Sequence, residues 1–428
     1  MIARVGKPHG RIRVLHICTT FGLSSGSGAN TRLTVNGLPR DRYAVFLAVP
    51  PNEAMQCHLS EDVTVFPLPN LCRSIRPVRD VRAFLDIYRL CKKWRFAVVH
   101  THNSKDGILG RWAARFAGVP AIVHTIHNIS FRSSRYRIVN WIYVALERIA
   151  ARVTTLLLAV SRENVREYLS HGVGRPEQYR VVYSGLDLER YRLIPNRTDA
   201  RASLGLEPDV PIAGWFGRFN AQKDPLTFIR AAREVAALVP DVQFVMCGDD
   251  PFGTGLHERV RTLASQLGMC ERIRFLGFRS DLPVVLAAVD VVMHSSRYEG
   301  MGRTICEALL CGRAVAGTDV DGVREVIVSD TRGGILVPPG DAVALARAAV
   351  RLIQDKTHAR DLASAGREWV QRHLSVADML NEIDAAYELA LSVPNRPKPP
   401  VPLVSSPVES LPGAIPGQLR VAAPGANR

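Results

Sequence analysis

The sequence predicts an α/β fold made of two doubly wound domains that face each other across a cleft. Short apolar runs alternate with helical patterns along most of the 428 residues, as in parallel sheets built from strand–helix–strand units. The runs form two series, separated by a polar, proline-containing stretch at 189–209. With 47% hydrophobic residues, a chain of this length can bury the cores of two or three domains.

The first series contains six predicted strands. They are rich in β-branched residues and do not alternate regularly, which is typical of parallel strands covered on both faces. They lie at 13–20, 43–50, 63–68, 96–102, 121–127 and 154–161, with helical patterns at 78–94 and 105–118. The second series contains six more, at 210–218, 242–248, 273–278, 289–296, 313–319 and 334–338.

Domain boundaries follow from the two series. We expect a leader, an N-terminal domain, a linker, a C-terminal domain and a final helix, at 1–10, 11–190, 191–209, 210–374 and 375–392. Residues 393–428 are rich in proline and poor in large apolar side chains. This composition predicts a disordered tail.

Composition restricts the class of protein. No apolar run approaches the roughly 20 residues that span a bilayer, and the N-terminus lacks the pattern of a signal peptide. The eight cysteines form no CxxC pair and lie mostly in apolar contexts. We therefore expect reduced thiols in a cytosolic protein.

Positive charge is concentrated in the first third of the chain. Residues 1–150 hold 22 Lys and Arg against 8 Asp and Glu, whereas the remainder holds 33 against 32. This asymmetry indicates an anionic partner, although a solvated arginine-rich surface would give the same count. The stretches 73–96 and 130–151 interleave arginine with aromatic residues, and we expect them to lie on an anionic membrane surface. Nucleic acid would explain the charge, but not the glycine turns described next.

Ligands of open parallel sheets bind at the carboxyl ends of the strands, and one strand end here carries the segment YEGMGRTICEALLCG. Gly300 and Gly302 let the backbone approach a ligand closely. The helix that begins near Thr304 turns its free N–H groups to the same place, which suits phosphate or sugar hydroxyls. Glu299 and Glu307 can accept hydrogen bonds from a sugar and from a ribose diol. A glycine turn with a glutamate also occurs in α/β proteins without such a ligand.

Two further loops follow predicted strands. In GWFGRFNAQKDP, Arg218 and Lys223 can converge on a diphosphate, although two basic residues in a loop are more often surface charges. The loop TTFGLSSGSGAN contains Gly26 and Gly28 and matches the dinucleotide fingerprint only loosely.

Two histidine-rich strand ends, HTHN and HTIHN, complete the set. We expect His102 and His127 to point into the cleft, although single histidines are more often structural. A metal ion is conceivable there, but no carboxylate or cysteine lies at ligand spacing, so we expect no metal site. Asp249 and Asp250, at another strand end, are a second place where carboxylates could hold a metal ion.

The order of these segments resembles that of the family 4 retaining glycosyltransferases, whose glycosyltransferase B fold has two Rossmann-like domains facing across a cleft. The resemblance covers about residues 11–390, and its most specific part is the Glu-x7-Glu segment. It implies an enzyme that moves a sugar from a nucleotide-diphosphate donor to a glycan or lipid-linked acceptor in cell-surface polysaccharide synthesis. It implies no metal or cofactor, retention of configuration, and a final helix that crosses back to the N-terminal domain. No carboxylate is placed as a nucleophile, so we expect front-face attack.

The resemblance also implies a role for each site residue. Glu299 would contact the donor sugar and Glu307 would hold the nucleotide ribose. Arg218 and Lys223 would neutralise the departing diphosphate. His127 would lie near the hydroxyls of the transferred sugar, at the reacting centre. The other residues that we expect to bind the donor are Gly26, Gly28, Gly217, Gly300, Met301, Gly302, Arg303 and Thr304.

The chain departs from the family pattern at three places. EGFGL reads EGMGR, so Arg303 adds a cation that either assists the leaving group or projects outward. NG(V/I)D reads SGLD, and GG reads Asp321-Gly322. We expect neither of these two to touch the core chemistry, but they leave the donor open between UDP- and GDP-sugars. The closest alternative is a nucleotide-sugar epimerase or a glycan phosphorylase on the same fold. A non-catalytic sugar-binding protein is more remote.

Overall fold

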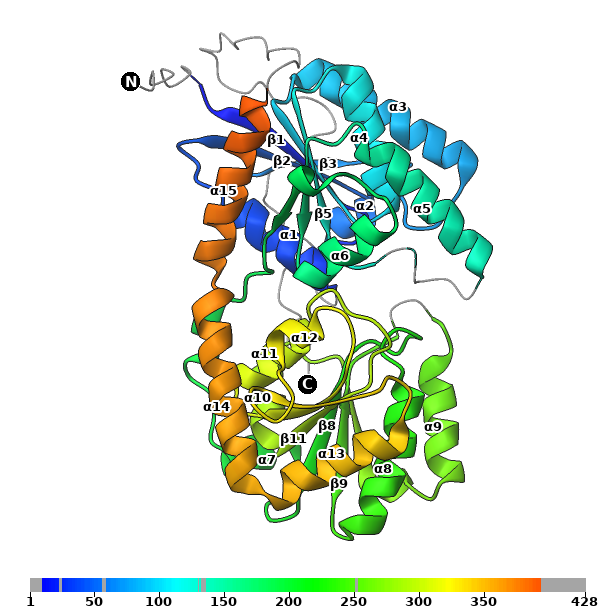
Figure 1. Cartoon of the computed structure of the whole chain (residues 1–428), viewed down its shortest axis with the longest axis vertical. Helices are drawn as coiled ribbons and strands as arrows, with labels where there is room; N and C mark the ends of the chain where they lie inside the picture. The colour runs from blue at the N-terminus through cyan, green and yellow to red at the C-terminus, as the bar shows by residue number, and fades with distance from the viewer. Residues whose placement is uncertain are drawn as a thin grey trace, which may run out of the picture.

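The computed structural model describes residues 10–22, 25–55, 59–129, 131, 136–250 and 253–393. The predicted leader and tail lie outside these residues, except for Gly10 and Val393. Two parallel sheets, each flanked by helices, lie one above the other in Figure 1. This arrangement confirms the predicted α/β fold with two Rossmann-like parts.

The N-terminal sheet has seven parallel strands in the order β3-β2-β1-β4-β5-β6-β7. All six predicted strands are present, and β7 is an addition whose three residues are too few to show a hydrophobic period. The bounds are β1 Ile12–Ile17, β2 Tyr43–Val49, β3 Thr64–Pro67, β4 Val98–His102, β5 Ala121–Ile126, β6 Leu156–Ala159 and β7 Tyr179–Val181.

The C-terminal sheet has six parallel strands in the order β10-β9-β8-β11-β12-β13. Each lies within a predicted strand. The bounds are β8 Ile212–Phe216, β9 Gln243–Cys247, β10 Ile273–Gly277, β11 Val291–His294, β12 Ala314–Thr318 and β13 Gly334–Val337.

Helices connect the strands in both halves. Those of the first half are α1 Gly26–Gly37, α2 Pro51–Ala54, α3 Pro77–Trp94, α4 Lys105–Ala117, α5 Arg137–Ala151 and α6 Arg162–Ser170. Those that follow are α7 Arg197–Leu204, α8 Pro225–Leu238, α9 Leu256–Gln266, α10 Leu282–Ala288, α11 Arg303–Leu310, α12 Val323–Val326, α13 Ala342–Gln354, α14 Lys356–His373 and α15 Val376–Ser392.

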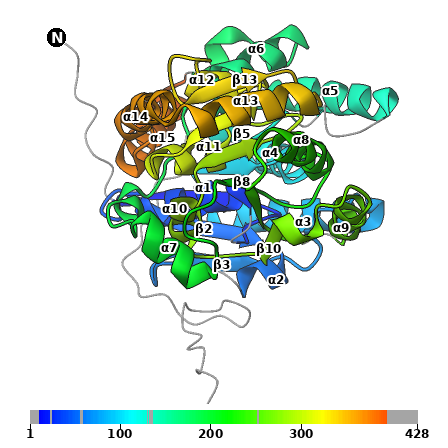
Figure 2. The same cartoon turned by 90° about the horizontal axis from the view of Figure 1, so that it is seen from below.

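Successive side chains of each strand point to opposite faces of the sheet, and each face has its own hydrophobic core. In the N-terminal sheet, α3 and α4 pack on one face, and α1 and α15 pack on the other. In the C-terminal sheet, α8, α9 and α13 pack on one face and α7, α10 and α11 on the other. Figure 2 shows α8 and α9 on one side of this sheet and α7 and α10 on the other. Helix α7 lies within the stretch 191–209 that was expected to be a linker.

The last two helices run along one side of both halves (Figure 1). Helix α14 packs against the C-terminal sheet and α15 against the N-terminal sheet, where Met379, Ile383 and Tyr387 are buried in its core. The chain therefore returns to its first half through α15. Among the described residues, seven cysteines are free thiols, and five of these are buried.

Candidate active site

A cavity of about 590 Å³ lies at the carboxyl ends of the strands of both sheets. Loops that follow β1, β4 and β5 line it from the N-terminal half, and loops that follow β8, β9 and β11 line it from the C-terminal half. This is the position at which open α/β sheets bind ligands. The cavity brings together nearly all the predicted site residues: Gly26, His127, Gly217, Arg218, Lys223, Glu299, Gly300, Met301, Gly302, Arg303, Thr304 and Glu307.

Two predicted residues lie elsewhere. Gly28 does not line the cavity; a Cβ built there would lie 2.8 Å from the backbone of Phe21, so this glycine lets α1 pack against the loop before it. The expectation that His102 points into the cleft is wrong. Its side chain is buried and its two ring nitrogens bond to His16 and His127.

Glu299 is the most tightly held carboxylate of the site. It forms an ion pair with Lys223. The same oxygen accepts hydrogen bonds from the hydroxyl of Ser296 at 2.7 Å and from the ring of His294 at 3.2 Å. Burial alone would raise the pKa of Glu299, but Lys223 and His294 outweigh burial and hold this pKa far below its usual range. Glu299 is therefore ionised and fixed in one orientation.

Asp321 fixes the backbone of the same residue. Its carboxylate accepts a hydrogen bond of 3.0 Å from the backbone N–H of Glu299, and both residues are buried. We expected the change from glycine to Asp321 not to touch the core chemistry; the structure places this carboxylate against the backbone of Glu299, which the sequence assigned to the donor site. The departure from the family pattern supports Glu299 directly.

The glycines of the EGMGR turn let it fit between the two halves. A Cβ on Gly300 would lie 2.0 Å from the carbonyl oxygen of His127, at the end of β5. Gly302 has a φ of 74°, which favours glycine, and it directly precedes α11. Together these residues bring the start of α11, with the positive end of its helix dipole, to the wall of the cavity.

Arg303 links the same turn to the N-terminal half. Its Nε donates to Glu307 at 3.2 Å, and its Nη1 donates to the carbonyl oxygen of Gly185 at 3.1 Å. Arg303 therefore does not project outward. It joins Glu307, the residue that is expected to bind the ribose, to the SGLD segment.

Cations gather on one side of the cavity. Burial, reinforced by the charge of Arg73, lowers the pKa of Arg218, while Glu299 and Asp249 oppose this shift. Arg73 also lines the cavity. The sequence placed Arg73 in a stretch assigned to a membrane surface, because nothing local shows that this residue turns toward the cleft.

His127 lines the cavity just after the end of β5. Burial lowers the pKa of His127 to about 4, so its ring is neutral at pH 7. Its Nε2 lies 3.1 Å from Nδ1 of His102. The ring can therefore exchange a hydrogen bond with a sugar hydroxyl through its other nitrogen.

Sequence reasoning missed other polar residues at the cavity. Asp106, at the start of α4, accepts a hydrogen bond of 2.8 Å from the backbone N–H of Thr19. Burial raises the pKa of Asp106 to about 7. It lines the cavity from the N-terminal half. Only the fold brings it there, because the helical pattern around it looks ordinary.

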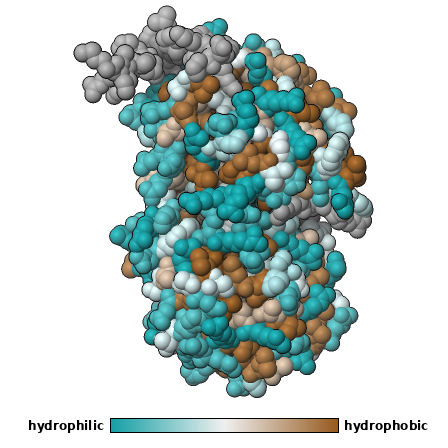
Figure 3. Space-filling model, viewed as in Figure 1, coloured by the Kyte–Doolittle hydropathy of each residue, from teal (hydrophilic) through white to brown (hydrophobic). Residues whose placement is uncertain are grey.

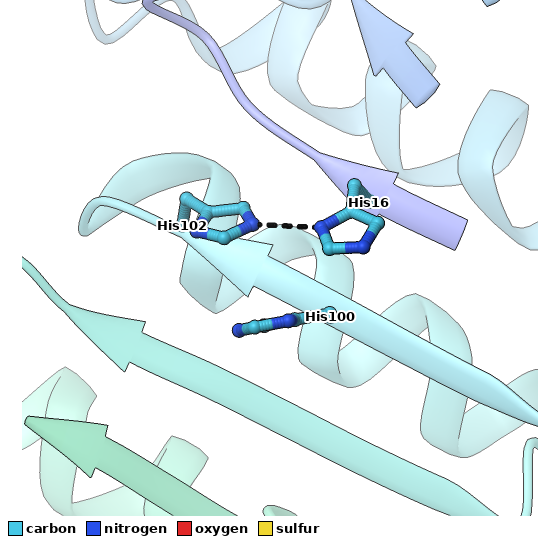
Figure 4. Close-up of side chains that lie close together, drawn as sticks. All are labelled: His16, His100 and His102. Carbon is cyan, nitrogen blue, oxygen red and sulfur yellow. Dashed lines mark hydrogen bonds between the residues drawn. The ribbon is translucent and has the colours of Figure 1, made fainter. Parts of the chain in front are cut away.

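A histidine cluster lies behind His127. His16, His100 and His102 offer nitrogen atoms within 4.8 Å of one another, close enough to hold a metal ion by distance alone. The three side chains come from β1 and β4 and are buried (Figure 4). Each of them already takes part in hydrogen bonds with neighbouring side chains.

Known proteins match both halves of the chain. The family described as Glycosyltransferase Family 4 matches residues 25–190, and the family described as Glycosyl transferases group 1 matches residues 210–355. The UDP-Gal:alpha-D-GlcNAc-diphosphoundecaprenol alpha-1,3-galactosyltransferase of Escherichia coli is 32% identical over 351 residues, which cover 81% of this chain and 89% of that protein. The putative glycosyltransferase EpsD of Bacillus subtilis is 27% identical over 326 residues, which cover 73% of this chain and 83% of that protein.

Solved structures share the fold. The crystal structure of Anabaena HepE in complex with UDP and glucose has a TM-score of 0.75 at 24% identity, and the match covers 88% of this chain and 100% of that chain. The two matched families, the relative from Escherichia coli and this fold agree with the geometry of the cavity. The chain belongs to glycosyltransferase family 4 and is a glycosyltransferase with the glycosyltransferase B fold.

Proposed function

We propose that this glycosyltransferase transfers a hexose from a UDP-sugar to a lipid-linked glycan, with retention of configuration and without a metal ion. The observation that supports it most is the single cavity that joins Glu299, Lys223 and Arg218 to His127 across the two halves. The relative from Escherichia coli carries a UDP-sugar and a diphosphoundecaprenol acceptor in its name. These supply the proposed classes of donor and acceptor.

The proposed mechanism follows from where charge develops. The bond between the anomeric carbon and the diphosphate oxygen breaks, and the acceptor hydroxyl oxygen bonds to that carbon. Negative charge grows on the diphosphate, where Arg218, Lys223 and the start of α11 stabilise it. The acceptor proton passes to the departing diphosphate oxygen, and UDP leaves.

The two carboxylates of the Glu-x7-Glu segment are already engaged. Glu299 is bound by Lys223, Ser296 and His294, and Glu307 by Arg303. A nucleophile must be free to form a bond to the anomeric carbon, and a tightly held carboxylate is poorly suited to that role. Attack by the acceptor on the face that the diphosphate leaves would give retention without a covalent intermediate.

An apolar and basic surface on the N-terminal half supports a membrane-bound acceptor. Along α5, Ile138, Trp141, Ile142, Leu146 and Ile149 are exposed at helical spacing. Along α3, Val78, Val81 and Leu85 are exposed beside arginines, and α4 lies between the two helices. We call these side chains of α3 and α5 the α3–α5 surface. Figure 3 shows hydrophobic side chains along the edge of the molecule where α3 and α5 lie in Figure 1.

The α3–α5 surface suits an anionic lipid surface. Exposed apolar side chains can enter the interface between headgroups and acyl chains, and each nearby Lys or Arg contributes about 1 kcal/mol of attraction to anionic lipids. None of the described helices is long and apolar enough to cross a bilayer. We propose that the enzyme binds peripherally to the inner face of the cytoplasmic membrane.

Vesicle sedimentation tests the membrane proposal. The enzyme is expected to sediment with vesicles that contain anionic phosphatidylglycerol at low salt, less at high salt, and little with neutral vesicles. Trp141→Ser is expected to weaken the binding, whereas Leu238→Ser, which removes an exposed leucine of α8 in the other half, is expected to leave it unchanged. Equal binding of both variants and the wild type, or no salt-sensitive binding, would contradict the proposal.

Product analysis tests the reaction itself. With UDP-galactose and a GlcNAc-diphospholipid acceptor, mass spectrometry is expected to show one hexose added to the acceptor for each UDP released. An epimerase would convert the donor without an acceptor, and a phosphorylase would require free phosphate. Either result would overturn the proposal. A thermal-shift screen narrows the donor first, because a ligand at a hundred times its Kd adds about 2.7 kcal/mol of stability.

A further inference from the structure

A continuous chain of buried hydrogen bonds runs from His127 into the N-terminal half. His127 Nε2 meets His102 Nδ1 at 3.1 Å, and His102 Nε2 meets His16 Nδ1 at 3.1 Å. Figure 4 shows the second of these contacts between β4 and β1. His16 Nε2 then lies 3.3 Å from the hydroxyl of Tyr387, on α15.

The chain continues beyond α15. The hydroxyl of Tyr387 lies 2.7 Å from His100 Nδ1, and His100 Nε2 lies 2.7 Å from the hydroxyl of Thr125. Both Thr125 and His127 line the cavity. The series of hydrogen bonds therefore begins at the cavity with His127 and ends at the cavity with Thr125, and both residues lie at the end of β5.

We propose that His102, His16, Tyr387, His100 and Thr125 are positioning residues, which fix the ring orientation and the tautomer of His127. The inference rests on the proposed function insofar as His127 faces the transferred sugar. It also gives α15 a role beyond packing against the N-terminal sheet, because the middle link of the hydrogen-bonded chain, Tyr387, is a side chain of that helix.

Each of the four histidines in this series of hydrogen bonds is neutral and therefore carries one ring proton. His16, His100 and His102 are buried, and His127 is partly buried at the cavity wall. Desolvation lowers the pKa of each of the four imidazoles below its ordinary value, so each ring carries one N–H and one acceptor nitrogen at pH 7. Every hydrogen bond in the series needs one hydrogen atom. The hydroxyl of Tyr387 takes part in two of these bonds, to His16 and to His100, but has only one hydrogen to donate. If that hydrogen points to His16, then His100 must donate to Tyr387; if it points to His100, then His16 must donate.

Only two arrangements satisfy every link. In the first, all hydrogens point toward His127, and all four histidines carry the proton on Nδ1. In the second, all hydrogens point toward Thr125, and all four carry it on Nε2. Any mixture leaves a buried hydrogen or lone pair without a partner, which costs about 1–3 kcal/mol. The four histidines must therefore share one tautomer.

The alternative for the same cluster is a bound metal ion. Coordination would take nitrogen lone pairs that now accept hydrogen bonds, and it requires those lone pairs to converge. The rings of His100 and His102 instead lie over one another, with centroids 4.4 Å apart and an angle of 31° between their planes. His100 uses both nitrogens for Tyr387 and Thr125. The geometry thus favours the hydrogen-bonded chain.

Nitrogen NMR of the ¹⁵N-histidine-labelled full-length enzyme tests the proposal, with single histidine variants to assign the resonances. His16, His100, His102 and His127 are expected to show one common neutral tautomer at pH 7.5. Two different tautomers among the four, or stoichiometric zinc retained by the purified protein, would overturn the proposal. This readout needs no substrate, so it stands apart from any failure to find the donor.

Tyr387→Phe tests the middle link, because it removes the hydroxyl and keeps the ring. We expect His16 and His100 to lose their common tautomer. We also expect kcat to fall by roughly ten- to a hundredfold, the range that a small misplacement of a reacting group costs, with KM for the donor unchanged. Tyr43→Phe is the matched control: Tyr43 packs edge-on against Tyr387, and its hydroxyl also bonds to α15, at Asp384, but lies outside the chain. Equal effects of the two variants would show a merely structural role.

Discussion

Gly300 in the C-terminal half lies directly against the carbonyl of His127 in the N-terminal half. A Cβ at this glycine would lie 2.0 Å from that carbonyl oxygen, which belongs to the backbone and cannot rotate away. The two halves thus touch at the residues that the proposed reaction needs most. Any side chain at position 300 must push the EGMGR turn and β5 apart.

Gly300→Ala is therefore expected to reduce kcat/KM by at least about a hundredfold, because a displacement of about 1 Å can cost that much. The melting temperature should change little, because each half keeps its own core. Gly317→Ala is the control, since a Cβ at this buried glycine of β12 would make only ordinary contacts of 3.4 Å or more. Steady-state kinetics give kcat/KM for both variants. A Gly300→Ala variant with the kcat/KM of the wild type would contradict the need for close contact between the EGMGR turn and β5.

Lys223→Met is expected to destabilise the fold in a pH-dependent way. In the folded chain the pKa of Glu299 lies well below the value of about 4.3 that glutamate has when unfolded. Its ion pair with Lys223 therefore adds stability above about pH 4.3, and this stability is lost as the pH falls from there toward the folded pKa.

At pH 7 the unpaired, buried carboxylate should lower the free energy of unfolding by about 3–5 kcal/mol. At pH 4 the loss should be smaller, because the carboxylate of the variant can take up a proton. Urea unfolding at both pH values measures the difference, with the exposed Lys356→Met as control. A loss that is equal at pH 7 and pH 4 would show that the charge pair is not its cause.

Arg218→Met is expected to lower kcat by about 10²–10³-fold, the usual cost of removing one preorganised group that stabilises transition-state charge. Arg218→Lys should recover part of the rate, since it restores the charge without the bidentate fork. Single-turnover measurements with the labelled donor separate this effect from product release. A rate within threefold of the wild type in Arg218→Met would remove this residue from the mechanism.

Asp321→Ala tests the support of the Glu299 backbone. The variant loses the acceptor of a buried hydrogen bond, which commonly costs about 1–3 kcal/mol, and we expect a matching fall of roughly tenfold or more in kcat. Asp319→Ala removes an aspartate two positions away that forms an exposed ion pair with Arg324, and such pairs contribute about 0–1 kcal/mol. Similar rates for the two variants would argue against a special role of Asp321.

Chelation tests the proposed absence of a metal from the mechanism. If Arg218, Lys223 and α11 carry the neutralisation of the diphosphate, then treatment with EDTA should leave the initial rate unchanged. The rate should also be the same with and without added Mg²⁺ or Mn²⁺. A rate that falls in EDTA and returns with a divalent cation would show that a metal shares this task.

The sequence predicted the sheets well because buried parallel strands are continuous apolar runs, which local patterning reveals. The strand β7 escaped because three residues, YRV, cannot establish a period. Helix α7 was overlooked because its stretch is polar. Ala200 and Arg201 are buried because α10 packs against α7, and Arg201 also bonds to the carbonyl oxygen of Ala288 and to Asp290.

The site was predictable where chemistry follows a local motif, and less so where it depends on distant residues. Glu299 and Lys223 both stood out at strand ends, but their ion pair joins residues 76 positions apart. The partners of His102 lie 86 and 25 positions away. No local pattern indicates that this ring turns away from the cavity, so its predicted direction was wrong.

The most direct test of the central claim is a crystal structure of the enzyme with UDP. The account predicts the diphosphate within hydrogen-bonding distance of Arg218 and Lys223, at the start of α11, with the ribose hydroxyls at Glu307. A diphosphate bound away from these cations, or bound through a metal ion, would contradict it.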